Sequence, residues 1–291
     1  MTEDSYNILT GAYDWGLLGL VILLSCIGCI TLYSAVTAGE ATLDKMFYIK
    51  QVVWFCAGLI LMAFSFLFNY KLLDRWAYTI YTICIFLLIA VLFLGKHVSG
   101  SQRWLMIGPL SIQPSELVKI AVIIILARYY SKHAYTRGFT LRNLIEPAIL
   151  VIIPFVLIVR QPDLGTALVV FLIAASITVF VKIARRSFIY IIISFMTTFP
   201  VIWFFLKEYQ QKRILTFINP ERDPLGAGYH IIQSKIAIGS GMITGRGFLK
   251  GTQNTLSFLP EEHTDFIFSV LAEEWGFAGS VFLIFLFLML L

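Results

Sequence analysis

The chain of 291 residues is 59% hydrophobic and only 13% charged, with a mean hydropathy of +0.85. Soluble domains carry about 25% charged residues, so this composition excludes a water-soluble globular protein and indicates one that crosses a membrane several times. The formal net charge of +5 does not indicate a nucleic-acid-binding protein, because Lys and Arg fall mainly between the apolar runs rather than in one patch.

Apolar runs long enough to cross a membrane recur along the chain. A transmembrane helix needs about 20 predominantly apolar residues. The first 14 residues are acidic and polar and lack the basic start of a secretory signal, so the first apolar run is predicted to remain as a span. Eight spans are predicted, at residues 15–36, 51–69, 76–95, 114–130, 144–160, 163–181, 187–206 and 266–291.

Basic residues between the spans predict the orientation of the chain. Cytoplasmic loops carry an excess of Lys and Arg, so the basic loops, and with them the amino terminus, are predicted to be cytoplasmic. The segments around 37–50, 96–113, 161–163 and 207–264 are then predicted to face outward. The basic residues that lead to this orientation are Lys71, Arg75, Arg128, Lys132, Arg137, Arg142, Lys182, Arg185 and Arg186.

The long outward segment, residues 207–264, is rich in glycine but also carries Ile, Leu and Phe. This mixture differs from the low-hydrophobicity, high-charge composition of a disordered segment, so short helices and turns are predicted. The run Gly239-Ser-Gly-Met-Ile-Thr-Gly-Arg-Gly247 superficially resembles a dinucleotide-binding loop, but its spacing is wrong and no strand precedes it. A tight turn is the preferred interpretation.

The chain as a whole is predicted to form a single domain over residues 1–291, because no low-complexity linker divides it. Its last residues, 280–291, end inside an apolar run without the basic flank expected at a cytoplasmic exit. We therefore expect the chain to be a C-terminally truncated part of a larger fold.

Two charges lie at the start of the fourth predicted span, in the motif Gln113-Pro-Ser-Glu-Leu-Val-Lys119. Pro114 suits the first turn of a helix, where its missing N–H is no loss. Glu116 and Lys119 are three residues apart, share a helix face and are predicted to pair. The pair has two interpretations of equal weight: it offsets its own burial, or it fixes the geometry of a lined cavity.

A short outward turn, Arg160-Gln-Pro-Asp-Leu-Gly-Thr166, separates two spans. Asp163 is placed to cap the following helix by accepting hydrogen bonds from its free N–H groups. Capping alone is an adequate explanation of this carboxylate. Arg160 adds a cation to the same turn.

A further cation, Arg103, follows the third predicted span in Gly100-Ser-Gln-Arg-Trp104. Trp104 suits the aromatic belt at a membrane interface. Arg103 has two interpretations that the sequence does not separate. Its side chain extends towards the lipid headgroups, or its planar guanidinium binds a phosphate or diphosphate group.

Asp265 lies where the long outward segment meets the last apolar run, in Leu259-Pro-Glu-Glu-His-Thr-Asp-Phe266. An ionised side chain inside a bilayer costs at least about 2.5 kcal/mol, so ionisable groups at a membrane boundary are functional candidates. The structural alternative is an N-cap, in which Thr264 or Asp265 satisfies the first N–H groups of the last span. Residue chemistry alone favours the cap.

Several of these motifs together resemble a known family. Pro114-Ser-Glu-x-x-Lys119, Gln161-Pro-Asp-Leu-Gly-Thr166 and Leu259-Pro-Glu-x-His-Thr-Asp-Phe266 occur in the order and topological positions of the SEDS family (shape, elongation, division and sporulation proteins). Residues 223–241 resemble its RodA branch rather than its FtsW branch. The resemblance covers essentially the whole chain and implies an all-α, polytopic membrane helix bundle of about ten spans, of which about eight are present.

The resemblance also implies an activity and a place in the cell. SEDS proteins are bacterial glycosyltransferases that polymerise the lipid-linked precursor lipid II into peptidoglycan at the outer face of the cytoplasmic (inner) membrane. The RodA branch acts in cell elongation and maintenance of the rod shape. The implied partners are a class B penicillin-binding protein, which is a transpeptidase, and other membrane proteins of the elongation complex.

Individual residues acquire roles from the same resemblance. Asp265 matches the essential acidic residue of the large outer loop and is our candidate for the base that activates the acceptor hydroxyl. Glu116 and Lys119 match a buried pair beneath the central cavity, and Asp163 and Arg103 match polar residues at its outer rim. The diphosphate leaving group needs cations, for which the candidates are Arg103, Lys119, Arg213 and Arg246.

Two other functions remain open at this stage, as does the need for a metal. The Glu116/Lys119 pair and the proline-interrupted helices also suit a lipid II flippase or transporter. A non-catalytic scaffold of the elongation machinery is the third hypothesis. No tightly bound cofactor is expected, and a divalent cation, Mg²⁺ or Mn²⁺, is an alternative partner of the diphosphate. The histidines are too scattered for a zinc motif; they are His97, His133, His230 and His263.

Overall fold

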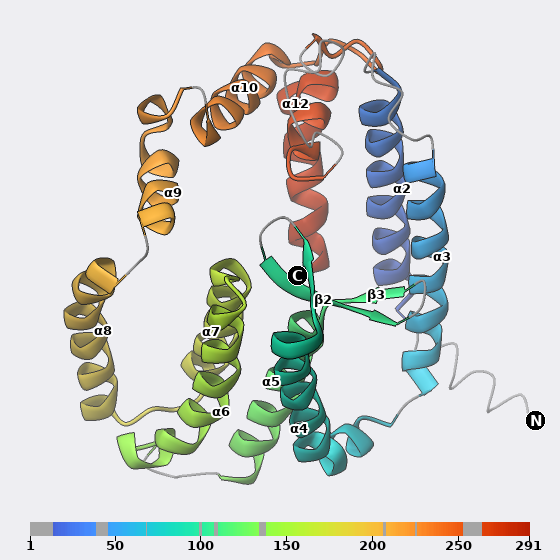
Figure 1. The fold of residues 1–291 in the computed structure, drawn as a ribbon. Coiled ribbons are helices and arrows are strands. Elements are labelled where there is room, and N and C mark those ends of the chain that lie inside the picture. The colour runs from blue at the N-terminus through green and yellow to red at the C-terminus, as the bar shows by residue number, and fades with distance from the viewer. Residues whose placement is uncertain are drawn as a thin grey trace, which may run out of the picture. The chain divides into compact units, whose positions relative to one another are not determined.

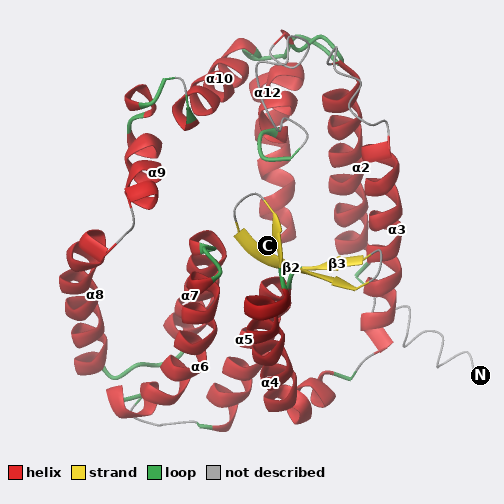
Figure 2. Cartoon of the chain, in the orientation of Figure 1, coloured by secondary structure: helices red, strands yellow, loops and turns green. Residues whose placement is uncertain are grey.

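Helices dominate the structure, a computed structural model, as predicted for an all-α membrane protein (Figures 1 and 2). Each of the eight predicted spans is a helix. The helices are α2 (Trp15–Ala38), α3 (Met46–Leu67), α4 (Tyr70–Leu94), α5 (Pro114–Lys132), α6 (Leu141–Arg160), α7 (Leu164–Phe180), α8 (Arg185–Phe205) and α12 (Ile267–Leu290). The structure describes residues 14–38, 46–67, 69–98, 101–107, 110–133, 138–205, 208–224, 226–252 and 264–291.

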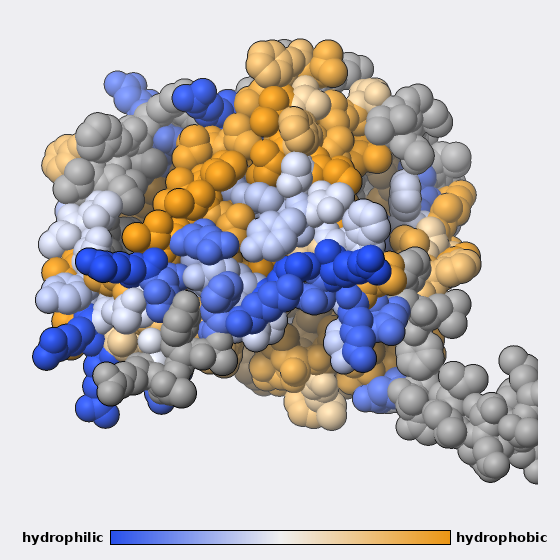
Figure 3. Space-filling model, turned by 90° about the horizontal axis from the view of Figure 1, so that it is seen from below, coloured by the Kyte–Doolittle hydropathy of each residue, from blue (hydrophilic) through white to orange (hydrophobic). Residues whose placement is uncertain are grey.

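Length and composition qualify many of these helices to cross a bilayer. Within the described residues, α2, α3, α4, α6 and α12 are long and apolar enough, whereas α7 is apolar but shorter. Helix α5 carries four charged residues, which separates it from the other spans. Large apolar side chains are widely exposed, among them Phe93, Ile152 and Phe180, and form broad apolar areas of the surface (Figure 3). A lipid environment covers such a surface, since hydrocarbon solvates it.

The chain divides into two compact units, and each is described by itself. One consists of residues Met1–Ser65 together with Phe205–Leu291, and the other of Phe66–Phe204. The single bundle expected from the sequence stays a prediction.

Helices α4, α5, α6 and α7 form the core of the Phe66–Phe204 unit. Small buried residues lie at their contacts, including Ala77, Ala121 and Ala167. Small side chains let helix backbones approach closely, which matters in a membrane because lipid offers no hydrophobic driving force between helices. Larger buried residues, such as Leu88 and Ile125, fill the remaining space. These contacts fix the ends of the helices, where the polar motifs lie.

A small antiparallel sheet between α4 and α5 is an addition to the predicted all-helical fold. It consists of β1 (Lys96–Val98), β2 (Ser101–Ile107) and β3 (Leu110–Ile112), in the order β1-β2-β3. Sequence analysis placed residues 96–113 outside the membrane but expected no strand. Strands β1 and β3, of three residues each, are too short to show a reliable alternation of apolar and polar residues, and the sequence of β2, Ser-Gln-Arg-Trp-Leu-Met-Ile, does not alternate. The sheet is important for the site because β2 carries Arg103.

In the other unit, the short helices predicted for the long outward segment are present. They are α9 (Glu208–Ile218), the 3₁₀-helix η1 (Pro220–Arg222) and α10 (Ala227–Ser240). Helix α10 packs against α12, where the hydroxyls of Ser234 and Ser269 are 2.7 Å apart. Helix α2 packs on α12 through Ile27 and Leu271. Helix α12 therefore organises this unit.

Helix α12 is broken at Gly276, whose φ of 68° and ψ of −162° are not helical. The glycine-rich turn after α10 supplies hydrogen-bond partners at the break. Met242 O and Ile243 O accept from the N–H groups of Phe277 (2.8 Å) and Ala278 (3.0 Å), while Arg246 N and Gly247 N donate to Glu273 O and Glu274 O, both at 3.0 Å. Unpaired backbone groups are costly inside a membrane protein, so the turn stabilises the break. The predicted tight turn is confirmed, but its contact with α12 was not anticipated.

Glycine at position 241 is required by this contact. A Cβ at Gly241 would lie 2.0 Å from Ala272 O, which is part of the α12 backbone. We expect Gly241→Ala to destabilise the protein by about 1–3 kcal/mol, because the clash is with backbone and overpacking has this cost. Thermal unfolding in detergent measures the effect. Gly239→Ala is the matched control, since a Cβ there meets nothing within 4 Å; equal melting temperatures for the two variants would contradict the close approach.

Candidate functional site

Asp163 caps α7, as predicted. It precedes the helix, is 5% exposed, and accepts hydrogen bonds from Thr166 N (3.2 Å) and Thr166 Oγ1 (2.8 Å). Gln161 in the same turn is buried, and its Nε2 donates to Leu88 O of α4 at 3.0 Å. Sequence analysis did not assign Gln161 a role. The turn between α6 and α7 is thus tied both to the helix that follows it and to α4.

Arg103 joins this turn from β2. Its Nη2 donates to Pro162 O at 2.9 Å, and its Nε lies 3.5 Å from Asp163 Oδ2. The side chain of Arg103 is 32% exposed. The two sequence alternatives, headgroup contact and phosphate binding, both overlooked this internal partner. The structure therefore brings together two of the predicted rim residues, and the charges of Arg103 and Asp163 offset one another.

The coupling of this pair is measurable in a double-mutant cycle. Asp163→Asn removes the charge but keeps a residue that caps helices well, so its effect reports mainly on the ion pair. We expect a coupling energy of about 0.5–3 kcal/mol between Asp163→Asn and Arg103→Gln, because contacting residues are not independent. Thermal unfolding of the two single variants and the double variant gives this energy. Arg160→Gln, on the same turn but exposed, serves as control, and strictly additive effects would argue against the pair.

Glu116 and Lys119 form the predicted ion pair, with Lys119 Nζ 2.7 Å from Glu116 Oε2. The resemblance implied a buried pair, and here the implied burial is wrong. The Glu116 side chain is 54% exposed and that of Lys119 is 26% exposed. The physical reason is the helix period: α5 turns Val118, Val122 and Ile125 into the core, and Glu116 lies on the opposite face.

Asp265 is exposed in the turn of residues 264–266 that precedes α12. The N-cap position is Phe266, whose side chain makes no capping hydrogen bond. The capping role that the residue chemistry favoured is therefore wrong for Asp265. No hydrogen bond or ion pair joins its carboxylate to another described residue. Its neighbours Leu259, Pro260, Glu261, Glu262 and His263 lie outside the described residues.

The last two candidate cations differ in their surroundings. Arg213 is exposed on α9. Arg246 belongs to the glycine-rich turn, where its Nη1 donates to Thr252 Oγ1 at 2.7 Å and its Nε donates to Ser240 O at 3.3 Å. Arg246 thus contributes to the internal structure of its unit, and phosphate binding by either residue stays a prediction.

Two buried carboxylates on α12 were missed by sequence analysis. Glu273 is 1% exposed and Glu274 is 2% exposed. Glu273 Oε1 accepts from Thr252 N (2.7 Å), Thr252 Oγ1 (3.0 Å) and Ser240 Oγ (3.3 Å), and lies 3.9 Å from Arg246 Nε. The sequence does contain a signal, since two adjacent acidic residues inside an apolar run are functional candidates by default.

Glu274 makes a second set of contacts beside the break in α12. Its Oε1 accepts hydrogen bonds from Leu249 N at 3.1 Å and from the hydroxyl of Ser34 on α2. The two glutamates thus hold both the segment of residues 249–252 and helix α2 to α12. A buried carboxylate requires such donors, because its desolvation is otherwise unfavourable.

This anchoring bears on Asp265. In the sequence, Asp265 comes thirteen residues after Thr252 and eight residues before Glu273. The segment that carries Asp265 therefore begins at Thr252, which is hydrogen-bonded to Glu273 of α12, and it ends at the first residues of the same helix. No group of three or more His, Cys, Asp or Glu side chains within the described residues is suited to hold a metal ion. The divalent cation stays a prediction.

Comparison with known proteins decides the family. The family model of the FtsW, RodA and SpoVE cell cycle proteins matches residues 14–291. The chain belongs to this family. The SEDS resemblance of its motifs is thereby confirmed, and the match covers both structural units.

Individual family members are similar over most of their length. The peptidoglycan glycosyltransferase MrdB of Escherichia coli K12 is 40% identical over 274 residues, which cover 94% of this chain and 72% of that protein. The probable peptidoglycan glycosyltransferase FtsW of Trichlorobacter lovleyi is 35% identical over 285 residues, covering 96% of this chain and 74% of that protein. A chain solved in work on the coordination of polymerization and crosslinking by a peptidoglycan synthase complex has a TM-score of 0.77 and 30% identity, covering 96% of this chain and 76% of that chain.

Proposed function

We propose that this protein is a peptidoglycan glycosyltransferase that polymerises lipid II at the outer face of the bacterial cytoplasmic membrane during cell elongation. The observation that carries the proposal is Asp265, an exposed carboxylate that does not cap its helix, in a chain 40% identical to MrdB. The family comparison gives the reaction class, and Asp265 gives that reaction a candidate base. The large loop is then extracytoplasmic and the amino terminus cytoplasmic, in keeping with the positive-inside rule.

The proposed reaction forms one glycosidic bond and breaks one bond to diphosphate. The acceptor sugar hydroxyl attacks the anomeric carbon of the donor, and the bond from that carbon to the diphosphate oxygen breaks. The hydroxyl proton passes to the carboxylate of Asp265, and polyprenyl diphosphate leaves with the electron pair. General base catalysis of this kind contributes about 10²- to 10⁴-fold to a rate.

Cations are proposed to stabilise the charge that develops on the diphosphate. Arg103, Lys119 and Arg246 each already contact a carboxylate of the protein, namely Asp163, Glu116 and Glu273 respectively. Each of these cations would therefore bind a phosphate while it also contacts its carboxylate partner. Arg213 makes no ion pair with another described residue and is exposed, which supports it as a direct contact. Mg²⁺ or Mn²⁺ bound with the diphosphate would supply the same kind of stabilisation.

The proposed partners are a class B penicillin-binding protein and other membrane proteins of the elongation complex. The similar chain solved in work on a peptidoglycan synthase complex supports this proposal. The RodA branch is likewise proposed rather than the FtsW branch. It is supported by residues 223–241 and by the 40% identity to MrdB of Escherichia coli K12.

Purified protein, with its transpeptidase partner and lipid II, provides the test. We expect glycan polymer on a gel, absent when the protein is omitted. A flippase is the second candidate, favoured by the Glu116–Lys119 ion pair in α5 and by Pro147 and Pro154 inside α6. Vesicles that translocate lipid II without polymerising it would support the flippase and contradict the glycosyltransferase. Protein that binds its partner but shows neither polymerisation nor translocation would support the scaffold.

A further inference from the structure

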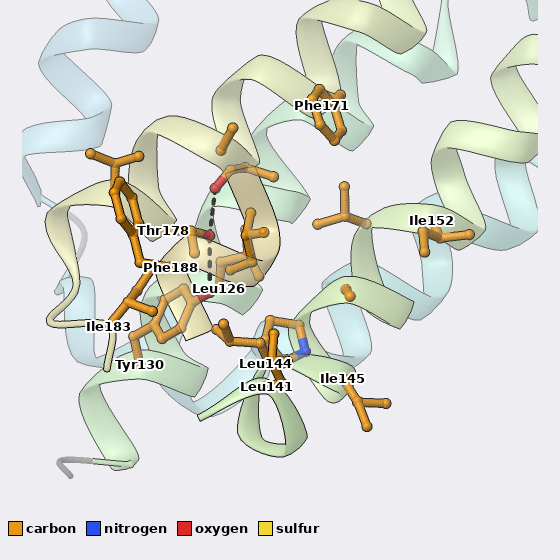
Figure 4. A pocket seen from close by; sticks show the side chains of 17 residues that line it. Leu126, Tyr130, Leu141, Leu144, Ile145, Ile152, Phe171, Thr178, Ile183 and Phe188 are labelled. Carbon is orange, nitrogen blue, oxygen red and sulfur yellow. Dashed lines mark hydrogen bonds between the residues drawn. The ribbon is translucent and has the colours of Figure 1, made fainter. Parts of the chain in front are cut away.

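An apolar groove lies in the Phe66–Phe204 unit, apart from every residue assigned above to catalysis. Its volume is about 440 Å³, within the range of roughly 300–1,000 Å³ for ligand sites. The walls come from the ends of α5 and α7 and from the starts of α6 and α8, with Leu126, Leu144, Phe171, Ala175 and Phe188 among them (Figure 4).

Polar atoms in the groove wall already have partners. The hydroxyls of Tyr130 and Thr178 are 2.9 Å apart, and Thr178 Oγ1 donates to Ala174 O at 2.7 Å (Figure 4). The groove therefore offers an apolar ligand contact area rather than unpaired hydrogen-bonding groups. A hydrocarbon chain suits such a wall.

The depth of the groove matches one leaflet of a membrane. Along α6 its lining extends from Leu141 to Ile152, which is about 16 Å at 1.5 Å per residue. The hydrocarbon core of a bilayer is about 30 Å thick. The groove thus begins at one predicted membrane surface and ends near the middle of the bilayer, as an acyl chain does.

Basic residues adjoin, in the sequence, the groove-lining residues at its surface end. Phe139 and Ile183 form a bridge, with Phe139 N donating to Lys182 O (2.9 Å) and Ala184 N donating to Phe139 O (3.0 Å). This bridge joins the segment before α6 to the segment before α8. It therefore holds the start of α6 near the start of α8. Leu141, Ile183 and Phe188 of these two segments line the groove, and three arginines are close to them in the sequence.

The three arginines are Arg142, Arg185 and Arg186, and all are exposed. They take part in none of the ion pairs found among the described residues. Glu146, one turn after Arg142, is exposed as well, and so is Lys182 beside the bridge. The cations therefore outnumber Glu146, and this end of the groove is positive.

We propose that this groove binds an acyl chain of an anionic phospholipid whose phosphate lies against Arg142, Arg185 and Arg186. Both features of such a lipid have a counterpart here: an apolar groove one leaflet deep, and a basic cluster at its surface end. Basic clusters at the cytoplasmic ends of transmembrane helices attract anionic headgroups. The site is independent of the proposed glycosyl transfer, since it includes none of the residues given a role in that reaction.

Native mass spectrometry of the purified protein in detergent, with equal amounts of dioleoylphosphatidylglycerol and dioleoylphosphatidylcholine, tests the proposal. We expect the wild type to retain phosphatidylglycerol preferentially. Arg185→Gln with Arg186→Gln is expected to lower that retention roughly 10- to 30-fold, and Arg185→Lys with Arg186→Lys to restore most of it. The charge-matched control is Lys71→Gln with Arg75→Gln on α4, which is expected to have no effect.

The groove itself is tested by Ala175→Trp, which fills it, against Leu168→Trp on the exposed face of the same helix. Only Ala175→Trp is expected to lower lipid retention. Equal retention of the two lipids would overturn the proposal and leave an annular lipid only. An equal loss in both pairs of charge variants, or unchanged retention in Ala175→Trp, would also overturn it. Melting temperatures show that each variant is folded.

Discussion

Replacing Asp265 by Asn is expected to lower the rate of glycan polymerisation by about 10²- to 10⁴-fold, which is the usual contribution of a general base. Asparagine keeps the size of the side chain but cannot accept the proton of the acceptor hydroxyl. The carboxylate is exposed and does not cap α12. The melting temperature is therefore expected to stay within about one degree of the wild type, because exposed substitutions away from special contacts change stability by less than about 0.5 kcal/mol.

Polymerisation of lipid II by purified protein with its partner measures this effect. Glu221→Gln is the control, since Glu221 is another exposed acid of the long segment between α8 and α12, and it is expected to leave the rate unchanged. Asp265→Glu is expected to keep part of the activity. Wild-type rates for Asp265→Asn would show that the catalytic assignment is wrong, and loss of folding in that variant would show that the carboxylate has a structural role.

Replacing Glu273 by Ala is expected to destabilise the protein by about 1.5–3 kcal/mol, the typical contribution of hydrogen bonds to a charged group. The change would leave Thr252 N, Thr252 Oγ1 and Ser240 Oγ without their shared acceptor and would remove the carboxylate beside Arg246. Because Thr252 begins the segment that leads to Asp265, polymerisation is also expected to fall at temperatures where the variant is folded.

Thermal unfolding in detergent and polymerisation below the melting temperature separate these two effects. Glu273→Gln keeps an acceptor oxygen and is expected to lose less stability, about 0.5–1.5 kcal/mol, because a neutral acceptor makes weaker hydrogen bonds than a carboxylate. Glu146→Ala removes an exposed acid and serves as control. A Glu273→Ala variant with the melting temperature of the wild type would contradict the anchoring role.

The helices of this protein could be predicted from the sequence almost completely. In hydrocarbon a chain must satisfy its backbone hydrogen bonds internally, and a helix does so within one continuous segment, so a long apolar run is expected to be helical. The predicted spans 15–36 and 266–291, for example, correspond to Trp15–Ala38 and Ile267–Leu290. The three strands were missed, because β1 and β3 have only three residues each and β2 shows no alternation of polar and apolar residues.

The candidate site was predicted only where partners are close in the sequence. The Glu116–Lys119 pair and the Asp163 cap each join residues three positions apart, and both were anticipated from helix geometry. The contact of Arg103 with Pro162 spans 59 positions and was not. The adjacent acids Glu273 and Glu274 were visible in the sequence, but nothing in it indicates Thr252, Ser240 or Ser34 as their partners.

The sequence by itself determined the class of protein, its helices and the residues able to do chemistry, because hydrophobicity and the helix period are local properties. Tertiary structure alone decided which of those residues form hydrogen bonds or ion pairs within the protein and which are exposed. Such contacts depend on packing between distant segments, as when a glycine-rich turn fits against the break at Gly276. Asp265 is the clearest case: its sequence suits a helix cap, but the backbone places the N-cap at Phe266 and leaves the carboxylate at the surface.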